Sequence, residues 1–172
     1  SVGEIPEDGE ELIKQVKEAD EDVTGILSKY NGKKRTIVNV KTLDKWLGYL
    51  FTTRIEKQWK SLTGTGIQTD GEDFNIGGVQ LGNIWIGVQP PLGISGDPMR
   101  LMFERDLTPH PQYVAYYKWL QNEFKADAIV HFGMHGTVEW LPGSPLGNTG
   151  YSWSDILLGN LPNLYIYAAN NP

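Results

Sequence analysis

The segment HFGMHGTVEWLPG, residues 131–143, holds the side chains of this sequence that are best suited to chemistry. It places His131, His135 and Glu139 at steps of four residues. Two imidazoles and a carboxylate can bind a divalent cation, and the same groups accept protons near neutral pH. The zinc-protease pattern H-E-x-x-H is absent, because a phenylalanine and a glycine follow the first histidine. A metal site, an acid–base site and a structural role, with His131 in the core and Glu139 in solvent, all stay open on spacing alone.

A second polar segment, QPPLGISGDPMR, covers residues 89–100. Gly93 and Gly96 would let the backbone approach a ligand closely, and Arg100 could bind a carboxylate through two parallel hydrogen bonds. A plain turn in which Asp97 caps the following helix explains the same residues. The phosphate-loop signature G-x-x-x-x-G-K-[ST] is absent, so we do not expect this chain to hydrolyse ATP by itself.

The elements that must position these segments alternate between strand and helix. The strands are predicted at NIWIGV (83–88), DAIVHF (127–132) and LYIYAA (164–169), and the helices at QYVAYYKWLQNEFKA (112–126) and SWSDILLG (152–159). This order predicts an α/β fold with a parallel-type sheet and flanking helices in residues 78–172. Ligands of such sheets bind beyond the carboxyl ends of the strands. We therefore expect the polar segments after the three strands to meet at one edge.

The N-terminal part has a different pattern. Apolar residues at helical spacing predict a helix over residues 7–30, followed by a turn over 31–35 and a short strand over 36–40. A second helix is predicted to begin with Thr42 as its cap and to run to Leu62. Residues 63–78 are expected to form a glycine-rich loop or a weak hairpin. The predicted division is a helical segment with a short strand over 1–62 and an α/β portion over 63–172.

Composition narrows the class of protein. With 172 residues, 40% of them hydrophobic, the chain is expected to form one globular domain. The net charge of −6 and the lack of a basic stripe argue against nucleic acid as a partner. The absence of cysteine excludes disulfides and thiolate metal sites, and no apolar run is long enough to span a bilayer. The strand-like end and the missing initial methionine suggest a fragment of an intracellular protein.

The order of motifs from Gly78 to Pro172 resembles a known family. GVQLGNIWIGVQPPLGISGDP, TPHPQYVAYY, HFGMHGTVEWLPG and GNTGYSWSD closely resemble the large, porphyrin-binding subunit of magnesium chelatase. They are similar, more distantly, to the large subunit of aerobic cobaltochelatase. The segment GDPMRLMFERDLTPHPQYVAYY looks like the magnesium-type version. Subunits of this family are much longer than 172 residues, which again implies a fragment.

The resemblance implies a function for the whole subunit. It would bind protoporphyrin IX and insert Mg²⁺ into it, a step towards chlorophyll, while two AAA+ ATPase-type subunits hydrolyse ATP that this chain does not bind. A porphyrin-binding accessory protein is a further expected partner. The expected location is the cytoplasm of a phototrophic bacterium or the chloroplast stroma. A cobaltochelatase and a non-catalytic module for tetrapyrrole binding or subunit docking stay open as alternatives, and the isolated stretch is expected to be inactive.

The resemblance also implies roles for particular residues. Glu139 falls on the family's HG-x-x-EW glutamate and is assigned as the catalytic group that guides the metal and accepts a pyrrole proton. His131 and His135 follow as transient metal contacts or proton shuttles, although imidazole suits magnesium poorly. The residues expected to contact porphyrin are Gln89, Arg100 and Trp140.

Overall fold

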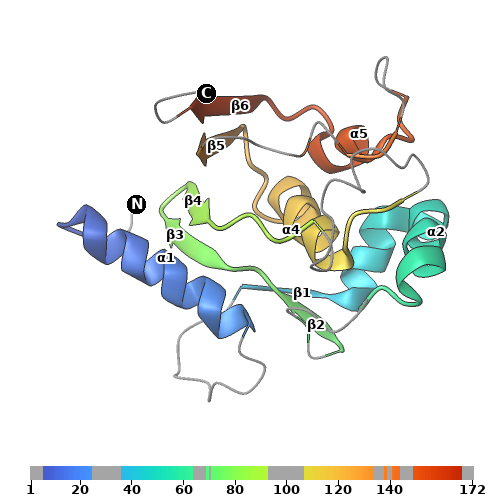
Figure 1. Cartoon of the computed structure of the whole chain (residues 1–172), viewed down its shortest axis with the longest axis horizontal. Helices are drawn as coiled ribbons and strands as arrows, with labels where there is room; N and C mark the ends of the chain where they lie inside the picture. Colours follow the sequence, from blue (N-terminus) through green and yellow to red (C-terminus); the bar gives the residue numbers. More distant parts are fainter. Residues whose placement is uncertain are drawn as a thin grey trace.

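The computed structural model describes residues 6–24, 36–63, 69, 71–92, 107–133, 138, 141–143 and 149–167. Four helices and six strands are assigned within these ranges (Figure 1). In chain order they are α1 (Gly9–Thr24), β1 (Ile37–Asn39), α2 (Val40–Trp59), β2 (Asp73–Asn75), β3 (Gly78–Leu81), β4 (Ile84–Gly87), α4 (Pro111–Asn122), β5 (Ile129–Gly133), α5 (Trp153–Leu158) and β6 (Asn163–Tyr167).

The strands form three pairs, and one of them is parallel. β5 and β6 run parallel, with His131 opposite Tyr165, and α5 lies in the connection between them. The predicted α/β class with a parallel-type sheet is thus confirmed. One detail was wrong, because β4 pairs antiparallel with β3 and does not join the parallel pair. Only Gly82 and Asn83 separate β3 from β4, and Gly82 adopts a φ of 63°, so the chain turns back in a tight hairpin.

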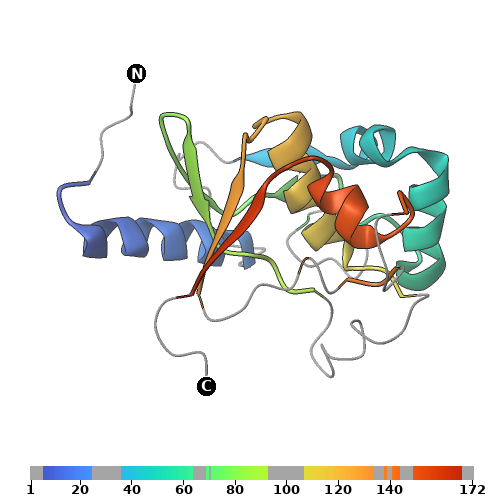
Figure 2. The ribbon, with the colours of Figure 1, turned by 90° about the horizontal axis from the view of Figure 1, so that it is seen from above.

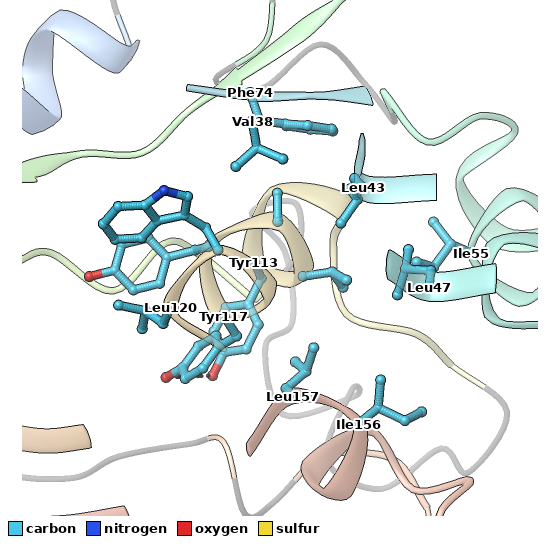
Figure 3. Close-up of a cluster of buried hydrophobic side chains, with 14 of the residues drawn as sticks. Val38, Leu43, Leu47, Ile55, Phe74, Tyr113, Tyr117, Leu120, Ile156 and Leu157 are labelled. Carbon is cyan, nitrogen blue, oxygen red and sulfur yellow. Dashed lines mark hydrogen bonds between the residues drawn. The ribbon is translucent and has the colours of Figure 1, made fainter. Parts of the chain in front are cut away.

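Helix α4 lies at the centre of the core. Its residues from Pro111 to Tyr117 are all buried, together with Trp119 and Leu120. Figure 3 shows how side chains of β1, β2, α2 and α5 surround it. The labelled core residues from these elements are Val38, Phe74, Leu43, Leu47, Ile55, Ile156 and Leu157. A helix that is apolar on most of its circumference is stable only when neighbours cover it on most sides.

His110 begins α4 and explains why the helix starts where it does. Its Nδ1 accepts a hydrogen bond from the backbone N–H of Gln112 at 3.2 Å, and Pro111 occupies the first helical position, where no N–H is needed. The His110 side chain is 1% exposed and packs edge-on against Trp59 of α2, with 4.9 Å between ring centroids. Burial lowers the pKa of His110 to about 4.

The N-terminal helices differ in detail from their predictions. The helix predicted over residues 7–30 is observed as α1 over Gly9–Thr24. Residues 25–35, which hold the rest of that prediction and the predicted turn over 31–35, lie outside the described residues. Helix α2 begins earlier than expected, because Asn39 and not Thr42 caps it, accepting a hydrogen bond from the Lys41 N–H at 3.0 Å. Gly48, with a φ of 70°, kinks α2. The core joins residues on both sides of position 62, and the division of the chain there stays a prediction.

The β5–β6 pair has two unlike faces. One face, which carries His131 and Tyr165, points towards α4 and its tyrosines. The other face is apolar and open to solvent. Its members and their exposed fractions are Val130 (52%), Phe132 (78%), Leu164 (53%) and Ile166 (51%). In the parts of the chain that the structure describes, no helix combines the length and apolar character that a membrane crossing requires.

Candidate functional site

A large open cavity separates the β3–β4 hairpin from the β5–β6 pair. Its volume is about 1740 Å³, and its walls come from α1, the hairpin, α4, β5 and β6. Figure 2 shows the hairpin beside β5 and β6, with α1 running across the far side of the hairpin from α4. Segments far apart in the sequence therefore contribute to one surface.

Gln89 reaches this cavity from the segment that follows β4. β4 ends at Gly87, and Pro90 and Pro91, which cannot donate to a strand ladder, prevent the strand from continuing beyond Gln89. The Oε1 atom of Gln89 accepts a hydrogen bond from the hydroxyl of Tyr117 at 3.0 Å. This contact ties the loop after β4 to the central helix α4.

His131 lines the same cavity from β5. Its ring stacks on the ring of Tyr165 in β6, with 4.6 Å between centroids and 12° between planes. The two residues are register partners in the parallel pair, so the strand pairing itself places one ring beside the other. The structure thus brings together two of the predicted site residues, Gln89 and His131, although β4 lies in a different sheet.

The other predicted site residues are Glu139, His135, Arg100 and Trp140, and all four lie outside the described residues. Val138 and Leu141, on either side of Glu139 and Trp140, are buried with exposed fractions of 0% and 7%. Within the ranges that the structure describes, no three His, Asp or Glu side chains gather as a metal site. The predicted metal ligands His135 and Glu139 are not among the residues searched, so that assignment stays a prediction.

Tyrosines of α4 supply the part of the wall that sequence reasoning did not assign to the site. Tyr116 and Tyr117 both line the cavity, although tyrosines within an apolar helical pattern are more often core residues. The hydroxyl of Tyr116 accepts a hydrogen bond from the Trp85 indole N–H at 3.2 Å, and burial raises its pKa to about 12. Burial, with Tyr113 as the next contribution, also raises the pKa of Tyr117. Both hydroxyls therefore stay protonated at neutral pH and can donate hydrogen bonds.

Gly87 makes the close packing of this wall possible. A Cβ atom at this position would lie 2.5 Å from the Tyr116 hydroxyl oxygen and 2.7 Å from the Trp85 Nε1 atom. The glycine at the end of β4 therefore lets the hairpin approach α4 closely. The sequence did contain a signal for this wall. Tyr113, Tyr116 and Tyr117 are spaced three and four residues apart on the predicted helix, so their hydroxyl-bearing rings lie on one side of it.

The fold and the cavity define a class of protein: a mixed α/β unit with an open, aromatic-lined site. The sequence model of the CobN/Magnesium Chelatase family matches residues 1–172, and the chain belongs to this family. It is 42% identical over 172 residues to a magnesium-chelatase subunit of Chlorobaculum parvum, covering 100% of this chain and 13% of that protein. It is 50% identical over 118 residues to a magnesium-chelatase subunit of Cereibacter sphaeroides, covering 69% of this chain and 10% of that protein.

A solved structure agrees with the fold. The catalytic subunit of cobaltochelatase from Mycobacterium tuberculosis matches with a TM-score of 0.74 and 30% identity over 99% of this chain and 15% of that one. These three relatives are thus subunits of magnesium chelatase and of cobaltochelatase. The chain spans only 13% and 10% of the length of the two curated relatives.

Proposed function

We propose that this chain is part of the large, porphyrin-binding subunit of a magnesium chelatase. The complete subunit inserts Mg²⁺ into protoporphyrin IX, as a step in chlorophyll biosynthesis, with ATP hydrolysed by two AAA+ partner subunits. The observation that carries the proposal is the identity of 42% over all 172 residues with a magnesium-chelatase subunit. Over all 172 residues the identity is 42% to this subunit and 29% to an aerobic cobaltochelatase subunit of Sinorhizobium, which supports magnesium as the metal. Over a shorter stretch of 97 residues a cobaltochelatase subunit of Pseudomonas aeruginosa is 41% identical, so a cobaltochelatase is kept as the second candidate.

The chemistry makes two demands on the site. Mg²⁺ gives up its bound water reluctantly, so the protein must offer oxygen ligands while the water leaves. Two pyrrole N–H protons must also leave the macrocycle as two Mg–N bonds form in their place. We assign both tasks first to Glu139, because a carboxylate can contact the cation and accept a proton. His131 and His135 are assigned to carry protons onward, which suits imidazole at neutral pH better than holding magnesium does.

The residues that line the cavity support the binding of a porphyrin. A tetrapyrrole is a flat aromatic macrocycle, and aromatic rings with a few polar groups are the usual lining of such a site. Gln89 can hydrogen-bond the macrocycle from the loop after β4, and His131 faces the same space from β5. Arg100 is proposed to pair with a propionate and Trp140 to contact the ring face.

Replacing Glu139 by glutamine in the complete subunit tests the proposal. The amide keeps the size of the side chain but cannot accept a proton, so the chelation rate with the ATPase subunits should fall about 100-fold. Porphyrin affinity, measured from the Soret shift on titration with deuteroporphyrin, should change less than about twofold. The matched control is Glu56→Gln on the exposed side of α2, which should keep full activity. Normal chelation by Glu139→Gln would remove Glu139 from the mechanism.

A cobaltochelatase is the second candidate, favoured by the solved relative with a TM-score of 0.74 over 99% of this chain. The assembled complex separates the two functions, because it should insert Mg²⁺ and leave Co²⁺ unused if the proposal is right. A Soret shift without insertion of either metal, even with the ATPase subunits present, would instead indicate a tetrapyrrole-binding or docking module.

A further inference from the structure

Two tyrosines, Tyr117 fully buried and Tyr165 half-buried, contact the two described residues of the proposed site. Tyr117 of α4 bonds Gln89, and Tyr165 of β6 stacks on His131. All four residues line the cavity between the hairpin and the parallel pair. The contacts pair each polar side chain with one aromatic side chain from a different element.

The Tyr117 side chain is held by contacts of its ring and by hydrogen bonds of its hydroxyl. Its side chain is 1% exposed, and its ring lies 4.8 Å from that of Tyr113, one helical turn earlier. Figure 3 shows the two rings side by side on α4. The Tyr113 hydroxyl donates to the Tyr117 hydroxyl at 3.5 Å, and Tyr117 in turn donates to the Gln89 Oε1 atom. Because Tyr117 stays protonated, as the raised pKa requires, this donor is available at every pH of interest.

The bond to Tyr117 decides which way the Gln89 amide points. A primary amide has an acceptor end and a donor end, and either can face a ligand when nothing orients it. With Oε1 held by a phenol at 3.0 Å, the amide is fixed in one of its two orientations. The rotamer freedom of a glutamine is large, so fixing it before a ligand arrives lowers the entropy cost of binding.

Tyr165 restricts His131 in a different way. The stack at 4.6 Å and 12° confines the imidazole to one plane. Tyr165 is itself held, because its hydroxyl accepts a hydrogen bond from the Asn163 side-chain amide at 3.3 Å. Asn163 and Tyr165 are two residues apart on one strand and therefore project from the same face of the pair.

We infer that Tyr117 and Tyr165 are positioning residues of the chelatase site, acting through the Gln89 amide and the His131 imidazole. The inference rests on the proposed function and extends it to two residues that need not touch porphyrin or metal. It separates their contributions. Tyr117 sets porphyrin affinity through Gln89, whereas Tyr165 sets the rate of insertion through the plane of His131.

The first experiment is a double-mutant cycle in the complete subunit. Tyr117→Phe keeps the ring and removes the donor, and it should weaken deuteroporphyrin binding about fivefold, the effect of one neutral hydrogen bond. In a Gln89→Ala background the same change should weaken binding less than about twofold, because its target is already gone. Tyr49→Phe, at a side chain that is 87% exposed, is the matched control and should bind as the parent does.

The second experiment uses the stack. Tyr165→Leu should lower the chelation kcat about tenfold, with porphyrin affinity within about twofold, because a misplaced proton carrier affects the reaction and not the binding. Tyr165→Phe keeps an aromatic face and should restore most of the rate. A structural defect alone would not give this rescue together with unchanged affinity, and thermal unfolding of each variant checks its fold.

The outcomes separate the inference from the proposed function. Additive effects of Tyr117→Phe and Gln89→Ala, no effect of either, or equal damage from Tyr165→Phe and Tyr165→Leu, would overturn the inference while porphyrin binding and chelation by the parent subunit still support the function. If the parent subunit gives no Soret shift and no chelation, both fail.

Discussion

Lowering the pH from 7 to 5 should destabilise the protein by about 2 kcal/mol through His110 alone. This side chain is 1% exposed, and burial lowers its pKa from the usual 6.5 to about 4. The unfolded chain therefore binds the proton more tightly than the folded chain between these two pKa values. Stability from His110 is complete above pH 6.5 and is lost progressively as the pH falls towards 4.

The magnitude follows from the two pKa values. At about 1.36 kcal/mol per pKa unit, the full effect is about 3 kcal/mol, and about 2 kcal/mol of it falls between pH 7 and pH 5. The structural reason is the cap of α4, where Nδ1 of His110 accepts the Gln112 N–H at 3.2 Å. Protonation of Nδ1 would turn this acceptor into a donor and place a charge against Trp59.

The assay is urea unfolding at pH 7, 6 and 5, followed by tryptophan fluorescence. Carboxylates also respond to acid, so the matched variant is His110→Asn, which keeps an acceptor suited to a helix N-cap and does not titrate in this range. The cavity left by asparagine lowers stability at every pH and cancels in the comparison. The parent should lose about 2 kcal/mol more than the variant between pH 7 and 5. Equal losses would refute the reasoning.

Two further changes test packing at the site and between helices. Gly87→Ala should lower the free energy of unfolding in urea by about 1–3 kcal/mol, because the new methyl would lie 2.5 Å from the Tyr116 hydroxyl oxygen. Gly9→Ala is the control and should be neutral, because no atom lies within 4 Å of the added methyl. Equal stability of the two variants would contradict the argument. Arg54→Ala should cost about 1–2 kcal/mol, because the guanidinium donates a 2.8 Å hydrogen bond to a backbone carbonyl and lies 4.9 Å from the ring of Trp153. Arg54→Lys should recover little, and full recovery would show that charge alone matters.

The positions of helices and strands along the chain were easier to predict from the sequence than the pairing of the strands. Apolar spacing located α4 and β5, because burial on one element leaves a periodic pattern. Strand pairing depends on turns, and the two-residue Gly82-Asn83 turn indicated the β3–β4 hairpin that we did not predict. The cap of α2 was misplaced, because Asn39 and Thr42 are both good caps and the choice depends on tertiary contacts.

The candidate site was predictable only where polar residues follow strands. Gln89 and His131 lie in segments of this kind, and the structure places both on the wall of the cavity, while their roles stay predictions. Tyr117 and Tyr165 were not predicted, because a tyrosine inside an apolar pattern looks like a core residue whichever way its hydroxyl points. Only the pairing of β5 with β6 and the packing of α4 reveal that these two side chains contact the site.

The solvent-facing side of the β5–β6 pair affects how the chain can be handled. Its four apolar side chains form a continuous strip, in which Phe132 is the most exposed member at 78%. Strips of this kind adhere to one another and to added hydrophobic dyes and porphyrins. Spectroscopic titrations on the chain by itself will therefore mix uptake at the strip with uptake in the cavity. A charged replacement such as Ile166→Lys, at a strip residue that does not line the cavity, offers a way to separate the two signals.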